Sequence, residues 1–166
     1  MSTARTARTG TQNRLSLLRK RASRLAATQA LYSTLVEDAG QNAAALCRMI
    51  LSQWDDSKRD DDGILPTSAM PDKTLLSTII ERALEERSRL DAAIDSILLT
   101  GWSRARTSPV LIATLMAAGA EWLASKRAGA VLVDEYAAVG ASLLSDEELS
   151  YLHKAMHVMF DGLPRA

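Results

Sequence analysis

Residues 19–36 read RKRASRLAATQALYSTLV, a basic turn that runs directly into an apolar segment. Leu31 and Leu35 lie on one side of the corresponding helix. At about 100° per residue, a second set of side chains falls within roughly 40° of a single line along it: Leu18, Ala22, Leu25, Gln29, Tyr32 and Val36. Because the segment is apolar on two sides, we predict a core helix over residues 15–38 that is held between neighbouring elements and whose N-terminal turns carry positive charge.

The rest of the chain has the composition of one compact helical domain. Its 166 residues are enough for a hydrophobic core, and four prolines and one phenylalanine in a chain rich in alanine and leucine favour helix. We find no alternating strand pattern. Apolar periodicity predicts further helices over residues 41–54, 72–99 (with a bend near 87–89), 108–124, 130–144 and 145–160. The prediction is therefore an all-α fold of six or seven helices.

Local signals mark several helix starts. Pro71 and Asp72 are start signals for the helix over residues 72–99. Ser108 and Pro109 are typical of an N-cap followed by proline at the first helical position, and Ser145 with Glu148 has the spacing of a capping box. The helix that follows Ser108 is apolar nearly all round, so we expect it to be the central buried helix. The acidic run before Gly63, in the loop 55–71, is not a calcium loop because Ala69 stands where the closing glutamate is needed.

Charge is distributed unevenly in a chain whose formal net charge is zero. Residues 1–24 contain seven Lys/Arg and no carboxylate, which leaves thirteen Lys/Arg against twenty Asp/Glu, a net charge of −7, in the remainder. We predict a disordered basic arm over residues 1–14 and a helical domain over 15–166. Such an arm points to an acidic partner, most commonly nucleic acid, and the alternative is a solvated tail without a partner.

Cys47 is the single cysteine, which excludes an internal disulfide and favours a reducing compartment. No apolar run is long enough to span a membrane, and the N-terminus lacks the apolar core of a secretory signal. We expect a cytoplasmic protein, although a start rich in Arg, Ser and Thr is also compatible with an organelle transit peptide.

Sites for catalysis are not evident in the sequence. His153 and His157 lie four residues apart, but a third metal ligand is missing from their neighbourhood in sequence. Asp134 and Glu135 point about 100° apart on a helix, so we expect them to cap or to pair with a basic neighbour rather than act as an acid–base pair. We predict no enzyme activity, no cofactor and no metal site.

Nucleic-acid binding is the function that the basic start favours. Arginine and lysine neutralise phosphates, and a tyrosine stacks on an unpaired base. Arg21 and Arg24 are the leading candidates because a protein core has few uses for an arginine, whereas Tyr32 lies on the core-facing line and has packing as its alternative role.

Three motifs occur in the order found in one known family. The first is Arg19-Lys20-Arg21-Ala22-Ser23-Arg24 followed by Ala26-Ala27-Thr28-Gln29-Ala30-Leu31-Tyr32; the second runs from Trp102 through Arg106 and Ser108-Pro109-Val110 to Glu121-Trp122-Leu123; and the third is Val131-Leu132-Val133-Asp134-Glu135-Tyr136-Ala137. Together they resemble the NusB family of transcription antitermination factors over residues 15–160.

The resemblance implies an all-helical, cytoplasmic RNA-binding factor. Members of the family pair with the ribosomal protein NusE, bind the boxA element of nascent ribosomal RNA leaders and act in the antitermination complex of RNA polymerase. Carried onto this sequence, and joined with the residues identified above, the resemblance gives this RNA-binding set: Arg19, Lys20, Arg21, Arg24, Gln29, Tyr32, Glu147 and Tyr151.

The sequence departs from the family at several positions. Leu111 and Ile112 stand where the family usually has charged residues, one of them near the NusE surface, and Met116 stands where the family commonly has an arginine. We take Leu111 and Ile112 as candidate partner-binding residues, either for a protein partner or for a second copy in a homodimer; the alternative is that both are buried. An exposed apolar patch there would favour a second function, a protein-interaction module of the same fold without specific RNA binding.

Overall fold

The computed structural model describes residues 2–37, 42–57, 69–98 and 103–165. Within these ranges the chain forms seven α-helices and one short 3₁₀ helix, which confirms the all-α prediction. They are α1 (Ser2–Val36), α2 (Ala43–Ser57), α3 (Lys73–Glu85), α4 (Arg87–Leu98), η1 (Arg104–Arg106), α5 (Pro109–Ala124), α6 (Gly129–Ala141) and α7 (Asp146–Gly162).

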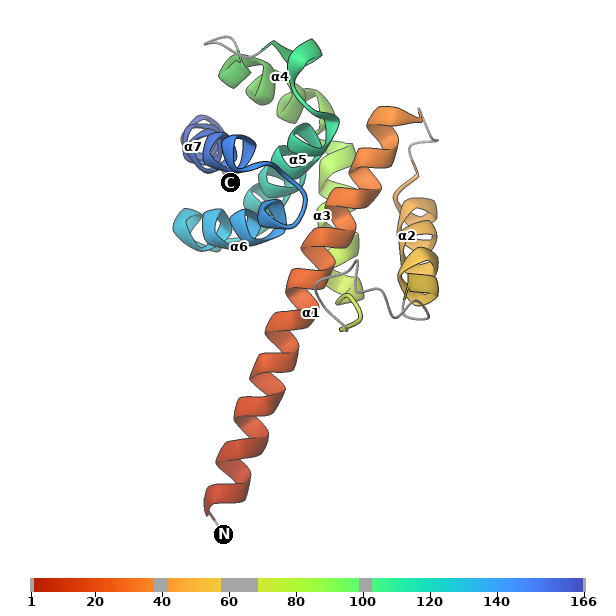
Figure 1. Ribbon diagram of the computed structural model, residues 1–166, viewed down its shortest axis with the longest axis vertical. Helices are drawn as coiled ribbons and strands as arrows, with labels where there is room; N and C mark the ends of the chain where they lie inside the picture. The colour runs from red at the N-terminus through yellow and green to blue at the C-terminus, as the bar shows by residue number, and fades with distance from the viewer. Residues whose placement is uncertain (1, 38–41, 58–68, 99–102, 166) are drawn as a thin grey trace.

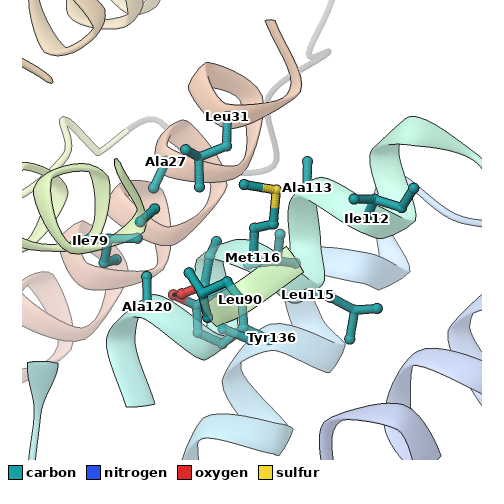
Figure 2. Close-up of a cluster of buried hydrophobic side chains, with 14 of the residues drawn as sticks. Ala27, Leu31, Ile79, Leu90, Ile112, Ala113, Leu115, Met116, Ala120 and Tyr136 are labelled. Atoms are coloured by element: carbon teal, nitrogen blue, oxygen red, sulfur yellow. Dashed lines mark hydrogen bonds between the residues drawn. The ribbon is translucent and has the colours of Figure 1, made fainter. Parts of the chain in front are cut away.

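Helix α5 is the centre of the fold (Figure 1). Every residue from 111 to 121 is buried, and α1, α3, α4, α6 and α7 all pack against this helix. Helix α2 packs on the outer side of α1 and α3. Figure 2 shows side chains of α1 and α3 converging on Ala113, Met116 and Ala120 of α5, with Leu90 of α4 and Tyr136 of α6 completing the same cluster. The predicted central helix is confirmed.

The predicted helix starts are confirmed by their hydrogen bonds. The Asp72 carboxylate accepts from the N–H of Thr74 (3.0 Å) and Leu75 (3.2 Å), and the Ser108 hydroxyl accepts from the Leu111 N–H (3.2 Å). The capping box of Ser145 and Glu148 is also present. In addition, Ser108 donates to the Glu148 carboxylate (2.6 Å), so the first turns of α5 and α7 are joined. This hydrogen bond is the main cause of the lowered pKa of Glu148.

The long segment after Asp72 bends as predicted. Glu86 separates α3 from α4. Arg104 of η1 forms ion pairs with two carboxylates of α4, Asp91 (2.8 Å) and Asp95 (2.7 Å). The predicted acidic loop at residues 60–63 lies outside the described residues. No helix in the described part of the chain is both long and apolar enough to cross a membrane.

The N-terminal segment differs from the prediction. We expected a disordered arm over residues 1–14, whereas α1 begins at Ser2 and extends away from the other helices (Figure 1). Residues 9–17 are all exposed, so this part of the helix has no share in the core. The segment contains no proline, and once α1 is fixed by packing, each added residue gains a backbone hydrogen bond without a new nucleation step.

Leu111 and Ile112 are part of the core, with 0% and 5% of their surfaces exposed. The prediction that they form a partner-binding surface is therefore wrong, and the alternative that they are buried is confirmed. The reason is that α5 is surrounded by five helices, so that apolar side chains on every side of it are covered.

We predict that Leu111→Ala lowers the free energy of unfolding by about 2–5 kcal/mol, because it leaves a cavity in a fully packed site. Urea denaturation followed by circular dichroism measures the change. Val158→Ala, at a residue that is 60% exposed, is the control and should change stability by less than about 0.5 kcal/mol. A Leu111→Ala protein as stable as this control would contradict the packing described here.

Candidate nucleic-acid interface

A buried ion pair lies where α1, α5 and α6 meet. Arg24 of α1 donates to both carboxylate oxygens of Glu121 on α5, from Nε at 2.9 Å and from Nη2 at 2.8 Å. The Tyr136 hydroxyl on α6 donates to the same carboxylate at 2.7 Å. All three residues are almost completely buried, with exposures of 1%, 1% and 0%. The carboxylate therefore ties three helices together through charge-assisted hydrogen bonds.

Protonation of this cluster is fixed by its own contacts. Burial alone would lower the pKa of Arg24, but the hydrogen bonds and the attraction from Glu121 outweigh it, and the net effect raises the pKa. Burial, together with the adjacent Glu121 charge, raises the pKa of Tyr136 well above its usual range. Arg24 consequently stays charged and Tyr136 stays neutral at any physiological pH.

Arg24 is therefore not available to RNA, and its prediction as an RNA-binding residue is wrong. The argument that a core has few uses for an arginine fails here because Glu121 is buried opposite it and needs a cation. The sequence did contain a signal. Glu121 is the only acid in an otherwise apolar helix, and such a carboxylate requires a buried partner.

Glu135 of α6 continues this cluster to the surface. Its Oε2 atom accepts from Arg24 Nη1 and from Arg21 Nε, each at 3.3 Å. The Glu135 side chain is 14% exposed, whereas that of Arg21 is 43% exposed. The expectation that this acid pairs with a basic neighbour is confirmed, and Arg21 is an exposed cation at the edge of the cluster.

Three further cations at this end of α5 were missed by the sequence analysis. Arg127, in the connection between α5 and α6, places Nε 3.7 Å from Glu121 Oε1, and the adjacent Lys126 is exposed. Arg165 donates to the backbone carbonyls of Ser125 (2.9 Å) and Arg127 (2.7 Å), which fixes the connection. The basic Lys126-Arg127 pair was visible in the sequence, but its position beside α1 depends on the packing of α5.

The remaining predicted residues on α1 do not share one face. Consecutive helical residues point about 100° apart, so Arg19, Lys20 and Arg21 are spread over about 200° of the helix circumference. Arg19 and Arg21 are exposed and Lys20 is partly buried. Tyr32 projects from the same side of α1 as Arg21, roughly 16 Å further along the axis, and is 37% exposed. Gln29 is partly buried and lies about 60° round the helix from Tyr32 and about 80° from Arg21.

Glu147 and Tyr151 lie far from the cations at residues 19–21 of α1. The Ser108–Glu148 hydrogen bond fixes the start of α7 at the N-terminal end of α5, thirteen residues before Glu121. At 1.5 Å per residue this corresponds to roughly 20 Å. Glu147 is exposed and Tyr151 is partly buried, which raises the pKa of its phenol. The structure therefore does not bring these two residues together with Arg21.

The two histidines of α7 lie side by side at the surface. The rings of His153 and His157 lie edge to face with centroids 5.2 Å apart, and both residues are exposed. Among the described residues, no group of three His, Cys, Asp or Glu side chains is placed to hold a metal ion. The fold and the site thus define a small all-helical domain with a cluster of cations at one end of its central helix.

Comparison with known proteins identifies the family. Residues 21–151 match the model of the NusB family. The chain is 31% identical over 139 residues to the transcription antitermination protein NusB of Nitrobacter hamburgensis, covering 83% of each protein, and 28% identical over 142 residues to that of Hyphomonas neptunium, covering 85% of this chain and 88% of the relative. This protein belongs to the NusB family.

A solved structure has the same fold. The structure of NusB from T. maritima superposes with a TM-score of 0.63 at 21% identity, covering 86% of this chain and 90% of the other. The relatives carry the name of a transcription antitermination protein.

We predict that Glu121→Gln lowers the free energy of unfolding by about 3–5 kcal/mol, because it leaves the Arg24 guanidinium buried without its full counter-charge. Chemical denaturation measures the loss. Glu81→Gln, which neutralises an exposed carboxylate on α3, is the control and should have an effect below about 0.5 kcal/mol. Equal stability of the two variants would show that the buried pair does not hold the three helices together.

Proposed function

We propose that this protein is a transcription antitermination factor that binds single-stranded, boxA-type leader RNA together with the ribosomal protein NusE and supports transcription of ribosomal RNA. The observation that carries the proposal is a group of cations around residues 19–21 of α1, of which Arg19, Arg21 and Lys126 are exposed, in a chain of the NusB family. In this proposal the protein acts in the cytoplasm as part of the antitermination complex of RNA polymerase.

Phosphate neutralisation is the role proposed for the cations. Arg19, Lys20 and Arg21 surround α1 where it leaves the body of the protein, and Lys126 and Arg127 lie at the same end of α5. Their attraction for the RNA backbone releases counterions and speeds association. These contacts position the RNA but do not read its sequence.

Base recognition is proposed for the aromatic residues and their polar neighbours. Tyr32 has an exposed ring on the Arg21 side of α1, which suits stacking on an unpaired base, and Gln29 can hydrogen-bond a base edge nearby. Tyr151 and Glu147 would contact a more distant part of the same strand, since roughly 20 Å of α5 separates them from the cations.

The alternative, a protein-interaction module without specific RNA binding, loses its main support. An exposed apolar patch at Leu111 and Ile112 would have favoured it, but both residues are buried. The same burial removes these two residues from a homodimer contact and from the NusE surface, so pairing with NusE would use other parts of the protein.

We predict that Arg21→Gln weakens RNA binding and reduces the slope of log K against log salt by about 0.7, the value for one phosphate contact on a single strand. Fluorescence anisotropy with a boxA-like strand and a scrambled strand, with and without NusE, measures both effects. Arg48→Gln, at an exposed arginine on α2, is the matched control. Wild-type binding without sequence preference and without a gain from NusE would overturn the antitermination function.

The exposed part of α1 gives a separate prediction. Deleting residues 2–14 should leave the free energy of unfolding within about 0.5 kcal/mol of the full chain, because the described side chains of this segment make no core contacts. The deletion removes Arg5, Arg8 and Arg14 and should weaken RNA binding at low salt. Unchanged RNA affinity after the deletion would identify the arm as a tail without a partner.

A further inference from the structure

We propose that Glu135 competes with RNA phosphate for Arg21 and thereby limits the affinity of the protein for single-stranded RNA. This inference rests on the proposed RNA-binding function and adds a residue that acts through Arg21, without requiring contact between Glu135 and the RNA. The argument follows from the way in which one carboxylate is shared between two arginines.

The two arginines depend on Glu135 to different extents. Arg24 is held by both oxygens of Glu121 at 2.8 and 2.9 Å, and Glu135 adds a longer contact at 3.3 Å. Arg21 has no contact with Glu121 of this kind, and its Nε pairs with Glu135 Oε2 at 3.3 Å. Removing the Glu135 charge therefore leaves Arg24 paired but releases Arg21.

The Arg21–Glu135 pair is weak enough to exchange. It is a single contact, and the arginine side chain is 43% exposed, so that water screens much of the attraction. A phosphate that approaches Arg21 from solvent can form a bidentate, charge-assisted contact in its place. Glu135 remains fixed nearby by Arg24, and its negative charge then lies close to the bound phosphate.

Both consequences act in the same direction. In the free protein Glu135 neutralises part of the Arg21 charge, and in the complex it repels the phosphate that replaced it. Glu135 consequently lowers RNA affinity even though it contributes to the packing of α1 on α6. The Glu135→Gln variant keeps the shape of the side chain and removes both effects.

The neighbouring Asp134 offers a matched control. Asp134→Asn changes the net charge by the same amount, one residue away on the same helix, but the Asp134 side chain points about 100° away and is exposed. A general effect of net charge would appear in both variants. Competition for Arg21 would appear in Glu135→Gln alone.

The experiment measures binding of the full-length protein to a boxA-like strand and to polyuridylate by fluorescence anisotropy across salt. We expect Glu135→Gln to tighten binding to both strands by about two- to five-fold at low salt and to steepen the salt slope. Asp134→Asn should change affinity by less than about 1.5-fold. In an Arg21→Gln background, Glu135→Gln should give no gain, a coupling that a merely structural role would not produce.

Several results would overturn the proposal. These are weaker or unchanged binding by Glu135→Gln, an equal gain with Asp134→Asn, or a gain that persists without Arg21. The Glu135→Asp variant, which keeps the charge but shortens its reach, should fall between wild type and Glu135→Gln, and thermal unfolding checks that each variant is folded. The comparison with polyuridylate separates the proposed function from the proposal about Glu135. If the wild-type protein binds both strands equally well, the antitermination function is overturned but the competition for Arg21 is not. If the wild-type protein binds neither strand, both proposals are overturned.

Discussion

The bidentate contact of Arg24 with Glu121 is the constraint on which the rest of the structure depends. Two charges removed from water are stable only when they meet in one geometry, so the pair fixes how far α1 slides and how it rotates against α5. Tyr136 adds α6 to the same point by donating to the carboxylate. The apolar side chains shown in Figure 2 make contacts that have no fixed direction, whereas the hydrogen bonds of the ion pair require one geometry.

That register determines which residues of α1 face solvent. Arg21 lies one turn before Arg24, and with Arg24 buried it emerges at the edge of the cluster beside Glu135. The same rotation directs Tyr32 outward further along the helix. A buried cation and a solvent-exposed one are thus neighbours in one short segment, where Arg24 holds helices together and the Arg21 side chain remains accessible to solvent.

Local features of the fold were predictable from the sequence, because they depend on residues close together in the chain. The caps at Asp72, Ser108 and Ser145 are examples, as is the central position of the apolar helix that follows Ser108. The roles of Arg24 and of Leu111 were not predictable in this way. An arginine in a basic cluster gives no local sign of the carboxylate that will be buried against it, and an apolar residue at the start of a helix gives no sign of which neighbours will cover it. Lys126 and Arg127 joined the site only through tertiary packing.

The unbroken course of α1 from the core to Ser2 gives the exposed segment a definite helical phase. Arg14 and Arg21 are seven residues apart, nearly two full turns, and therefore lie on one side of the helix about 10 Å apart along its axis. Tyr32 projects from the same side. The spacing between these groups is set by the helical repeat rather than by any contact, so the insertion of a single residue between Arg14 and Arg21 would turn the outer arginine by about 100°. For an RNA strand lying along this side of α1, the number of residues between the side chains would therefore matter as much as the type of each side chain.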